Sequence, residues 1–129
     1  MPFVYADVDD LEGTSKVGGK QCVALLQHYS KLPQTLLWKE GANVVGNLST
    51  KKGTAIATFS DGKYLNNGTG NHAAYYVSQD AAGIVVMDQW RSDVQKPTVS
   101  TRYLRRKGRS AKGELIDPSN NADAYSVIE

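Results

Sequence analysis

The order of its periodic segments constrains most what this chain can fold into. Near the N-terminus, apolar residues recur at three- and four-residue steps from Gln21 to Lys31, a helical pattern that Leu32-Pro33 ends. Four β-prone runs follow it, at residues 54–59, 72–77, 84–90 and 99–104. The connection at 78–83 is read as a loop, and it is too short for a crossover helix, so the runs beside it predict an antiparallel hairpin. We therefore expect an α+β fold in which a helix precedes an antiparallel sheet.

The length of 129 residues suits one domain with one core, so we expect a single domain over residues 1–129. No apolar run approaches the roughly 20 residues of a membrane-spanning helix, which predicts no membrane insertion. The first ten residues lack the basic and apolar regions of a secretory signal, so no signal peptide is expected. The formal net charge of +2 is too small to indicate nucleic-acid binding.

Three further segments show weaker patterns. Residues 36–53 have little periodicity and are expected to be irregular, with a short helical piece. Residues 102–112 carry six cations and no acid, which is typical of a solvated edge strand and loop, although such a run could also attract anionic groups. The last dozen residues resemble a loosely ordered chain end.

Cys22 is the only cysteine in the chain, and it falls in the first turn of the predicted helix. One cysteine excludes an intramolecular disulfide, and with two histidines there is no cluster for structural zinc, so we expect no metal and no cofactor. A helix N-terminus stabilises a thiolate, which would make Cys22 a nucleophile. Gly19 would let a substrate approach, and the Cys22 backbone N–H, helped by the Gln21 side chain, could donate to an oxyanion. The alternative is a small buried apolar residue, as most free cysteines are.

His72 is the candidate general base, because it opens a β-prone run after the glycine-rich segment 66–71. His28 is the competing histidine, but it lies six residues along the helix from Cys22, roughly 9 Å at 1.5 Å per residue. A third residue should accept a hydrogen bond from the imidazole. If Val77 pairs with Ile84, Gln89 lies opposite His72, whereas a slip of one residue brings Asp88 there. The sequence leaves both candidates open.

Four blocks of the chain resemble the type VI secretion amidase effectors, small relatives of the NlpC-like and CHAP peptidases. They occur in the order seen in that family, and they are Gly19-Lys20-Gln21-Cys22-Val23-Ala24-Leu25, residues 53–59, Gly70-Asn71-His72-Ala73-Ala74-Tyr75 and Val86-Met87-Asp88-Gln89-Trp90. The resemblance implies a papain-like minimal fold, with the cysteine on a helix and the histidine on an antiparallel sheet. It implies Cys22 and His72 as the catalytic pair and places Asn71, with Gln21 and Gly19, among the oxyanion or substrate-binding residues.

The resemblance also implies what such a protein does. It would be a peptidoglycan amidase, made in the bacterial cytoplasm and delivered by type VI secretion into the periplasm of a target cell. The sequence looks most similar to branches that cleave the meso-diaminopimelate to D-alanine cross-link, while the D-glutamate to diaminopimelate bond stays open. A cognate immunity protein and a component of the secretion apparatus are the implied partners. Other possibilities are a housekeeping or phage wall hydrolase of the CHAP type, or a non-catalytic module that binds cell wall.

Overall fold

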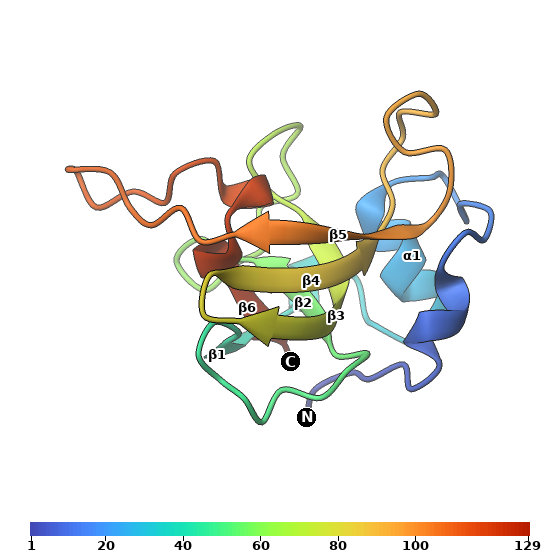
Figure 1. The fold of residues 1–129 in the computed structure, drawn as a ribbon, viewed down its shortest axis with the longest axis horizontal. Helices are drawn as coiled ribbons and strands as arrows, with labels where there is room; N and C mark the ends of the chain where they lie inside the picture. The colour runs from blue at the N-terminus through green and yellow to red at the C-terminus, as the bar shows by residue number, and fades with distance from the viewer.

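A six-stranded antiparallel sheet forms the centre of the molecule (Figure 1). The computed structural model describes residues 1–129. Across the sheet the strands run in the order β1-β6-β2-β3-β4-β5. Their bounds are Glu40–Asn43 for β1, Ala55–Thr58 for β2, Ala73–Asp80 for β3, Gly83–Asp88 for β4, Ser100–Arg105 for β5 and Tyr125–Ile128 for β6.

The only α-helix, α1 at Cys22–Tyr29, packs on one face of this sheet. Leu25 and Leu26 of α1 are fully buried, and they join Tyr75 of β3 and Met87 of β4 in one apolar cluster. Four short 3-10 helices complete the chain, at Val8–Leu11 (η1), Thr35–Leu37 (η2), Pro118–Asn120 (η3) and Ala122–Ala124 (η4). No helix in the structure has the length and apolar character needed to cross a membrane.

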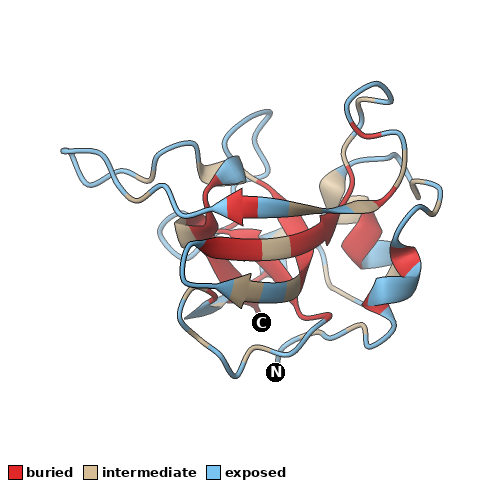
Figure 2. Ribbon diagram, viewed as in Figure 1, coloured by how far each residue is buried: buried red, intermediate tan, exposed pale blue.

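The opposite face of the sheet is covered by the C-terminal part of the chain. Ala122 and Ala124 of η4 and Tyr125 of β6 pack with Tyr76 and Val86 in a second buried cluster. Figure 2 shows the result, buried residues concentrated in the strands and exposed ones in the loops. Because both faces are covered, the central strands are buried on both sides, as in the BBBB pattern of β2.

The α+β prediction is confirmed, with a helix that carries Cys22 followed by an antiparallel sheet. The predicted loop at 78–83 was wrong, because β3 continues to Asp80 and leaves only Ala81 and Ala82 as the turn. The end of β3 resembles a loop in the sequence because Ser78, Gln79 and Asp80 are polar and partly exposed. The Asp80 side chain accepts hydrogen bonds from the backbone N–H groups of Ala82 and Gly83, as in a turn.

The register expected for this hairpin was also wrong. Ile84 lies opposite Gln79 rather than Val77, and Tyr75 lies opposite Met87. The two-residue turn at Ala81 and Ala82 sets the pairing of Gln79 with Ile84, and a β-bulge between Tyr76 and Ser78 then shifts the pairing by one position, because it inserts one residue into β3 only.

The chain end is not loose. β6 is an inner strand between β1 and β2, and all four of its residues are buried. A four-residue strand that is buried on both faces has no alternating pattern, and it follows the polar turn-like segment 117–123, so its sequence did not indicate a strand. The irregular segment 36–53 likewise contains the short strand β1 at its start, next to β6.

Candidate active site

Cys22 is the first residue of α1, and its side chain is half-buried. Gln21 precedes it in an extended conformation, with φ −77° and ψ 159°, and makes no side-chain capping bond. No protein atom accepts a hydrogen bond from the backbone N–H of Cys22. Gly18 has a φ of +57°, and a Cβ there would lie 3.0 Å from the Cβ of Ala24, so the loop before Cys22 requires glycine. The structure thus presents a thiol and a free N–H at one helix start.

Gln89 holds this loop in place. The side chain is fully buried just beyond β4; its Oε1 accepts from the Val17 N–H at 3.0 Å, and its Nε2 donates to the Val17 carbonyl at 3.1 Å. Nε2 also donates to the Gln21 carbonyl at 2.8 Å. Because the side-chain amide of Gln89 makes all these hydrogen bonds to the segment before Cys22, it does not reach His72.

His72 lies immediately before β3 and is anchored to β2. Its N–H donates to Thr58 Oγ1 at 3.0 Å, and its carbonyl accepts from the Thr58 N–H at 3.0 Å. The imidazole Nε2 lies 2.8 Å from Asp88 Oδ2. Since Tyr75 pairs with Met87, Asp88 lies opposite Ala74, and His72 is its diagonal neighbour on the same face. Of the two candidates for the third residue, the structure brings Asp88 to the imidazole.

Asp88 is fully buried among cations that the sequence reasoning missed. Arg102 Nε donates to Oδ2 at 2.7 Å, and Lys96 Nζ lies 2.8 Å from Oδ1 as an ion pair without hydrogen-bond geometry. Both cations lie 4.9 Å from the ring centroid of Trp90, whose plane is nearly perpendicular to the His72 ring. Arg102 belongs to the basic run 102–112, which was expected to be solvated. Its position in a strand that pairs with β4 was the one feature that could have indicated a contact with Asp88.

The remaining predicted residues lie around this centre. The side chain of Gln21 is exposed, and Gly19 is exposed with no atom within 4 Å of where a Cβ would stand. Asn71 is half-buried and accepts from the Asn67 N–H at 2.7 Å. His28 is exposed, and its ring meets that of Tyr29 edge-on.

Comparison with known proteins identifies the family. Residues 4–128 match the family described as Domesticated amidase effector 2. The chain belongs to this family. A Salmonella typhi protein named Type VI secretion amidase effector 2 protein is 48% identical over 133 residues, with both chains covered completely. The Domesticated amidase effector 2 of Ixodes scapularis is 37% identical over 123 residues, which cover 88% of this chain and 73% of that protein.

A solved structure supports the fold of this Domesticated amidase effector 2 family member directly. The structure is titled Type 6 secretion amidase effector 2; it matches with a TM-score of 0.92 and 48% identity, over 98% of this chain and 93% of the other. The match extends over the sheet and the helix that carry Cys22, His72 and Asp88.

The electrostatics of this family member favour a charged Cys22–His72 pair. Burial acts to raise the pKa of the Cys22 thiol, but hydrogen bonding to His72, the imidazole charge and the Ala73 N–H outweigh it, so the pKa is lowered. Burial acts to lower the pKa of His72, but its hydrogen bonds to Asp88 and Cys22 raise it to about 9. The His72 hydrogen bond and the neighbouring cations hold the pKa of Asp88 well below its usual range despite burial. The two shifts act in the direction that favours a thiolate beside an imidazolium.

Tyr64 is a further residue at the thiol that the sequence did not indicate. Its hydroxyl lies 3.7 Å from Cys22 Sγ, and Asn71 Nδ2 donates to the same hydroxyl at 3.4 Å. It comes from the loop between β2 and β3, and nothing in its local pattern distinguished it from a core tyrosine.

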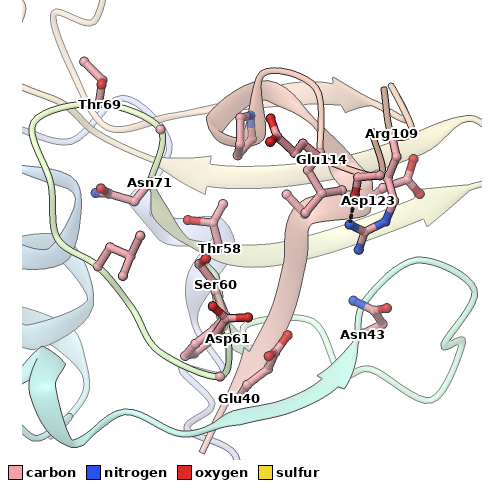
Figure 3. A pocket seen from close by; sticks show the side chains of 18 residues that line it. Glu40, Asn43, Thr58, Ser60, Asp61, Thr69, Asn71, Arg109, Glu114 and Asp123 are labelled. Atoms are coloured by element: carbon pink, nitrogen blue, oxygen red, sulfur yellow. Dashed lines mark hydrogen bonds between the residues drawn. The ribbon is translucent and has the colours of Figure 1, made fainter. Parts of the chain in front are cut away.

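A cavity of about 710 Å³ adjoins the site (Figure 3). Two neighbours of His72 line this cavity: Thr58, which is hydrogen-bonded to the His72 backbone, and Asn71, which precedes His72 in the sequence. Cys22 and His72 themselves do not line it. Its other walls come from the loops around Asp61 and Glu114, from β1 and from η3 and η4. The structure contains no group of three or more His, Cys, Asp or Glu side chains that could hold a metal ion.

Proposed function

We propose that this chain is a peptidoglycan amidase that cleaves peptide stems through a thiol mechanism, with Cys22 as nucleophile and His72 as proton carrier. Membership of the Domesticated amidase effector 2 family and similarity to proteins named amidase effectors support the reaction class. The observation that carries the proposal is the buried pair of His72 and Asp88 beside the thiol. Buried Asp88 holds His72 Nε2 at 2.8 Å, while His72 lowers the pKa of the half-buried thiol at the start of α1.

Acylation follows from this arrangement. The Cys22 thiolate attacks the substrate carbonyl carbon, the S–C bond forms, and the π electron pair moves to oxygen as an oxyanion. The unpaired N–H of Cys22 is one donor to that oxyanion, and the exposed Gln21 side chain is a second candidate. Since Nε2 is bound to Asp88, Nδ1 of His72 donates its proton to the leaving amine as the C–N bond breaks.

Deacylation reverses the proton transfer. Now neutral, His72 takes a proton from water at Nδ1, and the hydroxide adds to the thioester carbon. The S–C bond breaks, the acid product leaves, and Cys22 returns as a thiolate beside an imidazolium. Asp88 keeps its charge throughout and holds the ring in one orientation.

The substrate bond and the route of delivery belong to the same proposal. We favour the meso-diaminopimelate to D-alanine cross-link over the D-glutamate to diaminopimelate bond. Open space at Gly19 supports approach of a substrate backbone, and Asn71 lies where the site meets the adjoining cavity. The Salmonella typhi relative is named a type VI secretion effector. By analogy the chain passes through a type VI apparatus, binding one of its components, into the periplasm of a target cell, and an immunity protein protects the producer.

Digestion of diaminopimelate-type peptidoglycan followed by mass spectrometry of the muropeptides tests the proposal. Wild-type protein should convert cross-linked dimers to monomers, and Cys22→Ala should release nothing while keeping the wild-type circular dichroism spectrum. Shortened stems without loss of cross-links would identify the other bond. Activity that survives in Cys22→Ala would exclude the thiol mechanism, and no release by wild type would favour a non-catalytic wall-binding module.

A further inference from the structure

Tyr64 is held rigidly with its hydroxyl at the thiol. Its side chain is only 6% exposed, and its ring packs on that of Trp38 with centroids 4.9 Å apart. Trp38 is itself fixed, because its Nε1 donates to the Pro33 carbonyl at 3.0 Å. The hydroxyl oxygen lies 3.7 Å from Cys22 Sγ. The aromatic packing thus sets the position of the hydroxyl, with little freedom to move when a substrate binds.

Asn71 orients the proton of this hydroxyl. Its Nδ2 donates to the Tyr64 oxygen at 3.4 Å, and its Oδ1 is occupied by the Asn67 N–H at 2.7 Å. An amide NH₂ group can only donate, so the Tyr64 oxygen accepts from Asn71 and keeps its own proton for another acceptor. The other partner within reach is Cys22 Sγ.

We propose that Tyr64 is a further catalytic residue, whose hydroxyl donates a hydrogen bond to the oxyanion formed when Cys22 attacks the substrate carbonyl. The inference rests on the proposed function and adds a side-chain donor to the Cys22 N–H. The Tyr64 hydroxyl is already directed at Cys22 Sγ. When Sγ bonds to the substrate carbonyl carbon, the carbonyl oxygen lies only two bonds from the sulfur. As negative charge moves from sulfur to oxygen, the same donor can follow it. Tyr64 keeps its proton in every step.

The surroundings of Tyr64 suit a donor and not a base. Burial raises the pKa of the phenol, and the neighbouring Cys22 charge raises it further, far above its usual range. The hydroxyl therefore stays protonated at every pH at which the enzyme could work.

Tyr64→Phe tests this role, because it removes one oxygen and leaves the ring on Trp38. With a purified cross-linked muropeptide as substrate, kcat should fall about 100-fold, the scale found for loss of one oxyanion donor, with little change in KM. Alkylation of Cys22 by iodoacetamide needs the thiolate but forms no oxyanion, and the Tyr64 hydrogen bond is the smallest cause of the lowered thiol pKa, so the alkylation rate should fall far less than kcat. A fall in alkylation that matches the fall in kcat would overturn the proposal, because Tyr64 would then act through the thiol. An unchanged kcat would overturn it too.

Two other variants keep the result interpretable. Tyr103→Phe is the matched control, since that hydroxyl is bound to Asp80 on the exposed hairpin, and both rates should remain at wild-type values. Asn71→Ala keeps the phenol but no longer fixes the direction of its O–H bond, so kcat should fall less than in Tyr64→Phe. If Tyr64→Phe does not fold, an unchanged kcat in Asn71→Ala overturns the proposal. A wild-type protein inactive on every muropeptide, yet readily alkylated, would instead refute the proposed function.

Discussion

At the scale of single residues, Asp88 determines how the candidate site works. Its carboxylate is fully buried and would be costly alone, but His72, Arg102 and Lys96 each place a nitrogen within 2.8 Å of it. Such a group of charges is stable only as a whole, because removal of one partner leaves the others buried without compensation. In the proposed mechanism the same carboxylate orients the imidazole, so we expect stability and catalysis to depend on one side chain.

Asp88→Asn should therefore lower both quantities. We expect kcat to fall by about 10⁴-fold, as for other orienting aspartates, since an amide cannot stabilise the imidazolium. The unpaired Lys96 and Arg102 should reduce the unfolding free energy by about 3–5 kcal/mol. Muropeptide kinetics, measured at a temperature where circular dichroism shows folded protein, separates the two effects. Asp80→Asn is the control, since an amide oxygen can still accept the turn hydrogen bonds. Near wild-type turnover in folded Asp88→Asn would remove Asp88 from the mechanism.

The same residues show what the sequence could reveal about the site. Cys22 could be placed because a helix start is a local pattern of glycines and apolar spacing. The choice between Asp88 and Gln89 could not be made, because it depends on the bulge after Tyr76, which leaves no mark in the sequence. Tyr64 reaches Cys22 only through tertiary packing, and no periodic pattern reports such a contact.

At the scale of elements, β6 explains why the sheet needs the end of the chain. It joins β1 to β2, and its side chains contribute to both buried clusters, Ile128 to one and Tyr125 with Val127 to the other. The helix and the hairpin could be predicted from the sequence because each shows a period or a turn. β6 could not be, because four residues are too few to show either.

Ile128→Ala tests this account of β6. Ile128 is fully buried, so its truncation should cost about 2–5 kcal/mol of unfolding free energy. Val94→Ala is a matched apolar truncation at a side chain that is 93% exposed, and it should stay within about 0.5 kcal/mol of wild type. Urea denaturation monitored by tryptophan fluorescence measures both. Equal midpoints for the two variants would mean that β6 is not part of the stable sheet.

At the scale of the whole molecule, the charged pair links folding to pH. Between about pH 6.5 and 8.5 the unfolded chain holds a neutral histidine and a protonated cysteine. In the folded protein the pKa of His72 is raised to about 9, whereas the pKa of Cys22 is lowered. A raised histidine pKa gives stability that is lost as pH rises, whereas a lowered cysteine pKa gives stability that is gained, so the two shifts oppose each other across this window.

Cys22→Ala should break this balance. Asp88 still raises the pKa of His72, so the folded variant keeps a proton that the unfolded chain has lost above about pH 6.5. A raised folded pKa gives stability that is complete below the unfolded value and is lost as pH rises toward the folded one. The variant's unfolding free energy should thus decrease relative to wild type by up to about 2 kcal/mol from pH 6.5 to 8.5. Urea denaturation of both proteins across this range measures the difference, and all other titrating groups cancel in it. Parallel curves would mean that the pKa of Cys22 is not lowered in the folded protein, in which case His72 would have to remove the thiol proton during each turnover.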